Sequence, residues 1–242
     1  MKPHSEAEFK VQVCKITVQT GGRFVTVGEQ MKCIVTAGPT YEELDDVRRM
    51  TNFSTGALGT ELADYLVEAG HEVVLLRGYY STCRIEPKTS RLQVFTTTAD
   101  LSRQLKKLRS SKTGAVFHAA AVSDFSFGKI WRRTPGNKLV EIKSGKISTK
   151  AGPVLAELQP TPKIIARLRG WFPKARLVGW KYEVDGNRKT SVSHACYQLN
   201  SNQTDASVVN GPAYGKGFGL VTHSDSVFHC PDKRALFKAL AG

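Results

Sequence analysis

The strongest constraint on the fold is the order of elements between residues 33 and 78. CIVTA reads as a short buried strand, a glycine-containing loop follows, LGTELADYLVEAG has helical periodicity and closes at Gly70, and HEVVLLRG reads as a second strand. Short apolar strands without alternation are typical of a parallel sheet buried on both faces, which needs helices on both sides. The order therefore predicts a doubly wound, Rossmann-like α/β domain with a mostly parallel sheet.

The alternation of strands and helices continues along the chain. LQVFTT reads as a strand, ADLSRQLKKLRSS as a helix with Thr98 as its expected cap, and AVFHAAAV as a buried strand. Further on come a helix (PKIIARLRGWF), a strand (RLVGWKYE), a polar helix (NRKTSVSHACYQLN), a strand (DASVVN), and a terminal hairpin and helix. For 242 residues, and a prior of about 150 residues per domain, we expect a single ligand-binding domain at residues 31–242.

Two stretches fall outside this alternation. Residues 126–160 are rich in Gly, Pro and cations, and since long loops in compact domains are usually functional, they predict a flexible basic flap. Residues 1–30 alternate polar and apolar residues around Gly21-Gly22, which predicts an N-terminal β-hairpin appendage of unknown role.

Composition and charge narrow the class of protein. Thirty-five Lys and Arg against 21 Asp and Glu give a net charge of +14, which favours anionic partners such as phosphate esters or nucleotides. The basic residues are dispersed, without a polybasic tail, so we expect no nucleic-acid partner. No run of about 18 apolar residues occurs and the start MKPHSEAEFK has no secretory signal, which predicts a cytoplasmic protein with no membrane partner. Five cysteines without CxxC spacing, and no HExxH, support neither a disulfide framework nor a metal site.

Glycines mark the candidate binding loops. Gly38 follows the first strand of the domain, and Ser54, Gly56 and Gly59 open the helix after it. Such glycines let backbone N–H groups approach phosphate, and a helix N-terminus adds partial positive charge. GxGxxG and GxxxxGK[ST] are both absent, so an ordinary NAD site or P-loop is disfavoured. Turn and helix-packing roles remain the alternative for these glycines.

Five blocks in order over residues 33–242 follow the motif pattern of one known enzyme family. TAGPT precedes VRRMTNFSTGALG, where that family has VRxxxNxSSGxxG, and Thr55 replaces the second Ser. HAAAVSDF is similar to the family's AAVSDF segment, and KIST with the later GP and PKI resembles its flap, where bacterial members often have KIKK. GWKYE is similar to GFxxE, with Trp for Phe, and VVN to VAN. Together the blocks resemble phosphopantothenoylcysteine synthetase, the phosphopantothenate–cysteine ligase family of coenzyme A biosynthesis.

The resemblance implies a ligation in two steps. A nucleoside triphosphate activates the carboxylate of 4'-phosphopantothenate as an acyl-nucleotide with loss of pyrophosphate, and the cysteine amine then attacks the acyl carbon. CTP is the first expectation, which makes the intermediate an acyl-cytidylate, and ATP stays open. Mg²⁺ is expected because the leaving pyrophosphate needs its charge neutralised. The family also implies a homodimer with a site shared across the interface.

The resemblance also assigns roles to individual residues. The triphosphate would lie on Gly38, Ser54, Gly56 and Gly59, and the base and ribose against Trp180 and Asn210. Phosphopantothenate would be held by Arg48, Asn52, Ala120, Ala121 and Asp124. The two catalytic assignments are Asn52, which would orient the acyl group, and Lys146, which would stabilise growing negative charge. Lys143 and Lys150 are close rivals of Lys146.

Other functions stay open at this stage. A nucleotide- or flavin-associated oxidoreductase could use the same architecture, since fold alone does not fix function, and so could a non-catalytic nucleotide-binding protein. His118 and Cys196 are not interpreted as a base and nucleophile, because they lie in a predicted buried strand and a predicted helix with no motif that links them. GxSxG, the signature of a serine hydrolase, is absent.

Overall fold

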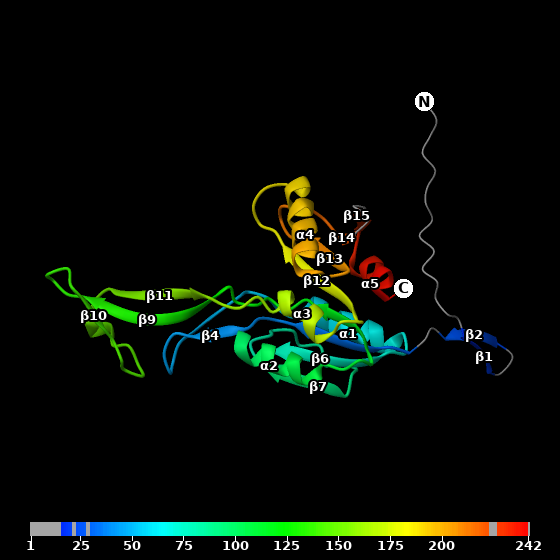
Figure 1. Ribbon diagram of the computed structural model, residues 1–242, viewed down its shortest axis with the longest axis horizontal. Helices are drawn as coiled ribbons and strands as arrows, with labels where there is room; N and C mark the ends of the chain where they lie inside the picture. The colour runs from blue at the N-terminus through cyan, green and yellow to red at the C-terminus, as the bar shows by residue number, and fades with distance from the viewer. Residues whose placement is uncertain (1–15, 21–22, 28–29, 223–226, 242) are drawn as a thin grey trace, which may run out of the picture.

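The protein folds around one large sheet, seen in a computed structural model that describes residues 16–20, 23–27, 30–222 and 227–241 (Figure 1). The spatial order of its eight strands is β15-β14-β13-β12-β8-β3-β6-β7. The strands are β3 (Lys32–Ala37), β6 (Glu72–Gly78), β7 (Arg91–Phe95), β8 (Thr113–His118), β12 (Arg176–Tyr182), β13 (Ala206–Asn210), β14 (Phe218–Thr222) and β15 (Val227–Cys230).

The strand order contains a switch point between β3 and β8. The chain enters at β3, adds β6 and β7 on one side, and then adds β8, β12 and β13 on the other, all in parallel. β14 and β15 extend the sheet in antiparallel fashion. In such open sheets a crevice forms at the carboxyl ends of the two strands where the order reverses. The predicted doubly wound, mostly parallel fold is confirmed.

Helices cover both faces of the sheet, as the apolar strands required. α1 (Ala57–Glu68) and α5 (Lys233–Ala241) share one buried cluster with Cys33 and Val35 of β3. α2 (Thr98–Leu108) and α3 (Ile165–Trp171) pack on the opposite face, where Ile34 of β3 lies. α4 (Arg188–Asn202) packs next to α3, over β12, β13 and β14. Side chains that alternate along β3 thus enter two separate cores.

One helix boundary differs from its prediction. The Thr97 side chain accepts a hydrogen bond from the Asp100 N–H of α2 at 3.2 Å, so Thr97 is the cap and Thr98 is the first helical residue. The Thr98 N–H instead donates to the Glu42 carboxylate at 3.0 Å. Thr97 and Thr98 both carry a hydroxyl that could cap the helix. The hydrogen bond from the Thr98 N–H to Glu42 accounts for the use of Thr97 as the cap.

The stretch at residues 126–160 is more regular than the expected flap. β9 (Phe125–Arg133), β10 (Leu139–Glu141) and β11 (Val154–Pro160) form a three-stranded antiparallel sheet in the order β10-β9-β11, which we call the arm. The arm projects away from the central sheet (Figure 1). Its glycines and prolines had suggested an irregular loop, but Pro135 and Gly136 lie in the turn between β9 and β10. Residues 142–153, which we call the flap segment, join β10 to β11 and contain the short 3-10 helix Thr149–Ala151.

Two short hairpins lie outside the main sheet. β4 (Tyr41–Glu43) and β5 (Arg49–Thr51) pair between β3 and α1, where the sequence had predicted only a loop, and β4 runs beside β9 of the arm. β1 (Ile16–Thr20) and β2 (Arg23–Val27) pair in antiparallel register. The turn expected at Gly21-Gly22 and residues 1–15 lie outside the described residues, and the domain boundary at residue 31 stays a prediction.

In the described chain, none of the helices has the length and apolarity to cross a membrane.

Candidate functional site

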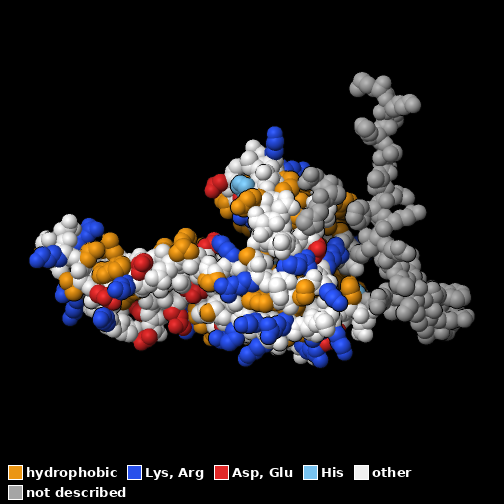
Figure 2. Space-filling model, viewed as in Figure 1, with side chains coloured by type: hydrophobic (Ala, Val, Ile, Leu, Met, Phe, Trp, Pro, Cys, Tyr) orange, Lys and Arg blue, Asp and Glu red, His pale blue; other side chains and the backbone are white. Residues whose placement is uncertain are grey.

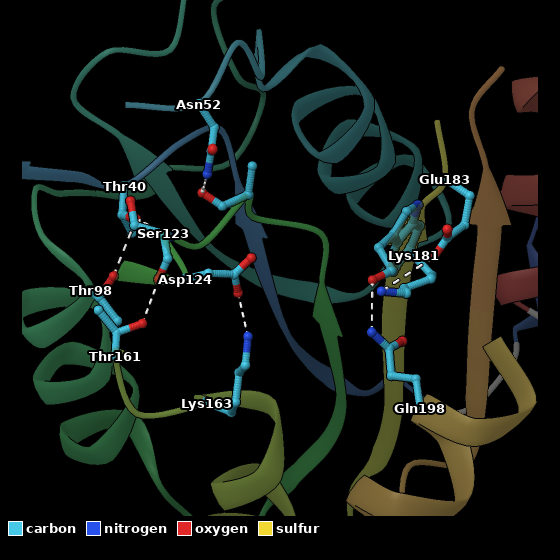
Figure 3. Close-up of polar contacts among 12 residues, drawn as sticks. Thr40, Asn52, Thr98, Ser123, Asp124, Thr161, Lys163, Lys181, Glu183 and Gln198 are labelled. Carbon is cyan, nitrogen blue, oxygen red and sulfur yellow. Dashed lines mark hydrogen bonds and ion pairs between the residues drawn. The ribbon is translucent and has the colours of Figure 1, made fainter. Parts of the chain in front are cut away.

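Three loops meet at the carboxyl ends of β3 and β8. The Ala121 N–H donates to the Gly38 carbonyl at 2.9 Å, and the Thr40 N–H donates to the Ala121 carbonyl at 3.1 Å. The same Ala121 carbonyl accepts a hydrogen bond from Asn52 Nδ2, also at 3.1 Å (Figure 3). Gly38, Asn52 and Ala121, which the sequence placed in one site, are therefore brought together through the backbone of Ala121.

The backbone of Ala120 is hydrogen-bonded to a buried pair of polar side chains, Thr36 and His118. Its N–H donates to Thr36 Oγ1 at 3.1 Å, and Thr36 Oγ1 lies 2.9 Å from Nδ1 of His118. Thr36 Oγ1 can donate to Nδ1 or accept from it, depending on the tautomer of the ring. Burial lowers the pKa of His118 to about 4, so the ring is neutral at physiological pH. His118 thus has a structural role, as the sequence interpretation held.

A network of buried hydroxyls supports the loop after β8. Thr40 Oγ1 donates to Ser123 Oγ at 3.0 Å, accepts from the Ser123 N–H at 2.8 Å and lies 3.3 Å from Thr98 Oγ1 (Figure 3). Thr161, which lies shortly before α3 in the chain, donates to the Ser123 carbonyl. The sequence motifs pointed at Asp124 but gave no sign that Thr40 and Thr161 both bond to Ser123, or that Thr98 contacts Thr40.

Asn52 and Asp124 line one small pocket. It has a volume of about 200 Å³, and its lining residues are Met50, Thr51, Asn52, Ser123, Asp124 and Phe125. Asp124 also forms an ion pair with Lys163, which follows the arm just before α3 (Figure 3). Two of the residues predicted to hold phosphopantothenate thus share a cavity, and one of them is paired with Lys163, a cation that had no assigned role.

The glycines form a close contact between β3 and α1. Gly56 caps α1 with φ 77° and no side-chain cap, and a Cβ there would lie 3.2 Å from the Gly38 Cα. A Cβ at Gly59 would lie 2.6 Å from the Ala37 Cβ. Ser81, after β6, donates from Oγ to the Thr55 carbonyl at 2.7 Å, a contact that no motif indicated. These residues present a helix N-terminus at close range to the crevice, which suits an anion such as phosphate.

Asn210 is the last residue of β13, and Trp180 lies close to the end of the neighbouring strand β12. The Glu183 N–H donates to the Asn210 carbonyl at 2.9 Å, and Gln198 Nε2 donates to the Trp180 carbonyl at 3.1 Å (Figure 3). Trp180 Nε1 is buried and has no hydrogen-bond partner among the described residues. A buried donor without an acceptor costs about 1–3 kcal/mol, so an acceptor on a bound ligand is an advantage here.

Glu183 carries a small charged cluster beside Trp180. Its carboxylate lies 3.2 Å from Lys181 Nζ and 3.2 Å from His194 Nδ1, as Figure 3 shows for the lysine. Glu183 and Lys181 come from the GWKYE block, but His194 comes from α4 and had no motif. The cluster therefore joins α4 to the strand end where the nucleotide was expected.

Arg48 lies between β4 and β5, and Lys146 lies in the flap segment. Neither residue is part of the close contact between α1 and the loop after β3. Arg48 Nη2 donates to the Ile147 carbonyl at 2.7 Å, so Arg48 contacts the flap segment directly after Lys146. Lys146 and its rival Lys150 are both exposed. Within residues 30–222, no hydrogen bond or ion pair joins Lys146 to Asn52 or to Gly56. Lys143, the other rival, lines a separate cavity of about 340 Å³ beside Asp46 and Glu141.

Among the described residues, no group of three or more His, Cys, Asp and Glu side chains is arranged to hold a metal ion. A magnesium ion is usually held by one or two carboxylates together with substrate phosphates. Any Mg²⁺ at this site would therefore depend on the nucleotide for most of its ligands.

Fold and site together define a doubly wound α/β domain in which loops with glycines meet at the switch point of the sheet. Residues 29–237 match the family described as the DNA/pantothenate metabolism flavoprotein C-terminal domain, and the chain belongs to this family. The resemblance to phosphopantothenoylcysteine synthetase, inferred from the five sequence blocks, is thereby confirmed at the level of the family.

Individual relatives agree with this assignment. The coenzyme A biosynthesis bifunctional protein CoaBC of Thermococcus kodakarensis is 34% identical over 182 residues, which are 75% of this chain and 41% of that protein. The chain thus spans about two fifths of that relative. The DNA/pantothenate metabolism flavoprotein from Streptococcus pneumoniae has a crystal structure with a TM-score of 0.75 and 26% identity, covering 87% of this chain and 96% of that one. A Cab2 variant in complex with phosphopantothenate-cysteine shares the fold with a TM-score of 0.63 at 20% identity, over 87% of this chain and 85% of that one.

Proposed function

We propose that this chain is a phosphopantothenate–cysteine ligase that works through an acyl-nucleotide intermediate. One observation carries the proposal: the loops that hold Gly38 and Asn52 converge on the backbone of Ala121 at the switch point of the sheet. CTP is the first expected nucleotide and ATP the alternative. A reaction between an activated carboxylate and an amine needs a phosphate cradle next to a group that orients an acyl carbon, and the crevice offers both.

The nucleotide would bind along the crevice from α1 to the ends of β12 and β13. Gly38, Ser54, Gly56 and Gly59 would hold the triphosphate, because three glycines bring the first turn of α1 against the loop after β3. Trp180 and Asn210 would contact the base and ribose. The Nε1–H of Trp180, which has no partner in the part of the chain that the structure describes, supports this, because a ligand acceptor would satisfy it.

The pantothenate carboxylate would lie beside Asn52. A carboxylate oxygen of phosphopantothenate attacks the α-phosphorus of the nucleotide and pyrophosphate leaves, which gives the mixed anhydride. The amine of cysteine then attacks the acyl carbon, the bond from that carbon to the phosphate oxygen breaks, the nucleoside monophosphate leaves with the electron pair, and the nitrogen loses a proton to solvent. Ala120, Ala121 and Asp124 would bind the remainder of phosphopantothenate, and Lys146 would stabilise the charge that grows on the phosphate and carboxylate oxygens. Mg²⁺ would neutralise the pyrophosphate charge and would arrive with the nucleotide.

A homodimer is part of the proposal. The arm exposes several large apolar side chains, and Figure 2 shows apolar and basic side chains along it. These side chains are Phe125, Leu139, Val140, Val154 and Leu158. Apolar groups gathered on a projecting sheet favour a protein partner, and a second copy is the partner that the family suggests. The cytoplasmic location stays a prediction.

The test is pyrophosphate release by the purified protein with Mg²⁺, 4'-phosphopantothenate and either CTP or ATP, with and without cysteine. We expect release with one of the nucleotides and a product that contains cysteine. Asn52→Asp should keep the fold and lose turnover, because a second carboxylate beside the reacting acid repels it. A folded wild-type protein that binds nucleotide without releasing pyrophosphate would instead indicate a non-catalytic nucleotide-binding protein.

A further inference from the structure

A single carboxylate joins the β4–β5 hairpin to the flap segment. The side chain of Asp45 is 2% exposed. Its Oδ1 accepts hydrogen bonds from the Val47 and Arg48 N–H groups at 3.0 and 2.7 Å. Its Oδ2 accepts from the Ile147 N–H at 3.1 Å, across 102 residues of sequence. A buried carboxylate is tolerated when several donors satisfy it, and here three backbone N–H groups do so.

Two further bonds hold the same turn of the flap segment. Arg48 Nη2 donates to the Ile147 carbonyl at 2.7 Å, and the Asp46 N–H donates to the Gly145 carbonyl at 2.9 Å. The Ile147 side chain is buried, at 4% exposure. The residues on both sides of Lys146 are thus tied to the hairpin, while Lys146 itself is exposed.

The charges of the contact are complementary as well. Arg48 Nη1 lies 3.5 Å from Asp45 Oδ2, so the guanidinium faces both the carboxylate and the flap carbonyl. Burial of the Asp45 carboxyl would by itself raise its pKa, but the N–H groups of Ile147, Val47 and Arg48, together with the Arg48 charge, hold that pKa below its usual value. The carboxylate is therefore ionised wherever the enzyme would operate.

We propose that Asp45 and Arg48 are positioning residues that form a latch for the flap segment and thereby set the position of Lys146. The contacts described above support the latch itself. Only the effect of the latch on catalysis depends on the proposed ligase function. The latch also gives Arg48 a role different from direct substrate binding, because one of its terminal nitrogens is already engaged by the Ile147 carbonyl. Lys146 then acts from a backbone held at both neighbours, whereas Lys143 and Lys150 lie outside the bonded turn.

Limited trypsin digestion tests the latch without any assay of activity. Trypsin must bind the chain around Lys146–Ile147 in an extended form, so its cleavage rate there reports how often the turn detaches. Asp45→Asn replaces one acceptor oxygen by an NH₂ group that faces backbone donors. We expect cleavage after Lys146 to rise by about 10-fold or more, and cleavage after Lys216, an exposed site far from the arm in sequence, to stay unchanged as the internal reference.

A matched control and a second variant complete the digestion experiment. Asp46→Asn removes the same charge one residue away, from a side chain that is exposed and has no described hydrogen bond, and should leave every cleavage rate within about twofold. Ile147→Ala keeps the carboxylate but removes the buried side chain of the turn, and should also raise cleavage after Lys146. If neither Asp45→Asn nor Ile147→Ala raises it, or if Asp46→Asn raises it equally, the latch is wrong.

Kinetics then separate positioning from binding. With the wild-type enzyme turning over, Asp45→Asn should lower kcat by about 10-fold with little change in the KM for phosphopantothenate, and Arg48→Lys should recover more kcat than Arg48→Ala. If Arg48→Ala instead raises the KM for phosphopantothenate and leaves kcat and the rate of proteolysis unchanged, Arg48 binds the substrate directly and the proposal is wrong. Absence of turnover in the wild type would refute the ligase function and leave the digestion result valid.

Discussion

The crevice and the arm are built in different ways. In the crevice the contacts are made by backbone atoms, glycines and buried hydroxyls, so that Ala121 is bonded to Gly38, Thr40 and Asn52 at once. In the arm most side chains are exposed, and the flap segment is joined to the β4–β5 hairpin by a few hydrogen bonds, among which Asp45 accepts one from Ile147 and Arg48 donates one to Ile147. A sheet with helices on both faces fixes the place where substrates would be bound, whereas the segment that carries the proposed catalytic lysine is held by only a few bonds.

This difference has a physical reason. A phosphate cradle loses affinity when its donors shift by fractions of an ångström, so a rigid frame suits it. A catalytic cation that must close over a substrate and then release the product needs an element that detaches at low cost. Changes in the crevice should therefore affect the stability of the whole domain, and changes in the arm should affect turnover or local opening.

The largest expected effect is in the arm and is purely kinetic. Lys146→Ala should lower kcat by about 10²–10³-fold, the size found when a preorganised electrostatic group is removed from a transition state. Thermal unfolding should be unchanged, because the Lys146 side chain is exposed. Lys143→Ala and Lys150→Ala are the matched controls, and a larger loss of kcat in either of them would move the catalytic role to that lysine.

The next effect is in the crevice and is a pH dependence of stability. The pKa of His118 is lowered from 6.5 to about 4 by burial, so the unfolded chain binds a proton at pH values where the folded one does not. Stability is therefore full above pH 6.5 and falls as the pH drops from 6.5 to 4, by about 3 kcal/mol in total at about 1.4 kcal/mol per pH unit. Urea unfolding at several pH values measures this slope.

Two variants separate the ring from its partner in that experiment. His118→Asn should abolish the slope between pH 6.5 and 4, because the titrating group is gone. Thr36→Val removes the hydroxyl that bonds to Nδ1 but leaves the ring buried, so stability should fall at every pH with the slope retained. A slope that survives in His118→Asn would mean that another group is responsible.

A smaller effect tests the close contact of α1 with β3. Gly59→Ala should destabilise the domain by about 1–3 kcal/mol and weaken nucleotide binding, because the added Cβ would lie 2.6 Å from that of Ala37. Gly170→Ala is the matched control in α3: a Cβ there meets nothing within 4 Å, so it should stabilise by about 0.5–1 kcal/mol. Equal urea midpoints for Gly59→Ala and the wild type would show that the contact can relax, and the argument for a rigid crevice would fail.

The sequence predicted the sheet better than the arm, and the reason lies in which signals are local. Strands such as β3 and β6 are short apolar runs, which burial on two faces requires, so their residues alone reveal them. In β11 nearly every residue is exposed, and its pairing with β9 depends on distant residues, so glycine and proline nearby suggested a loop. The Asp45–Ile147 bond spans 102 residues and leaves no pattern in the sequence. Motifs pointed to Asn52 and Ala121, and TAGPT includes Thr40 without indicating that its hydroxyl bonds to Ser123, whereas Ser81 belongs to no motif.

The smallest expected effect concerns Asp45, and its sign is opposite to what burial of a lone carboxylate would give. Its folded pKa is lower than the 3.8 of an ordinary aspartate, so the unfolded chain takes up the proton first as the solution becomes acidic. The stability that the latch contributes is therefore complete above pH 3.8 and is lost as the pH falls through the lower folded pKa. Thermal midpoints of the wild type and Asp45→Asn should accordingly differ at pH 7 and converge as the pH falls below 3.8, whereas Asp46→Asn should show no such convergence. A gap that persists at that acidic pH would mean that the Asp45→Asn substitution damages the hairpin by its shape, and the contrast between a rigid crevice and a latched arm would then lose its electrostatic basis.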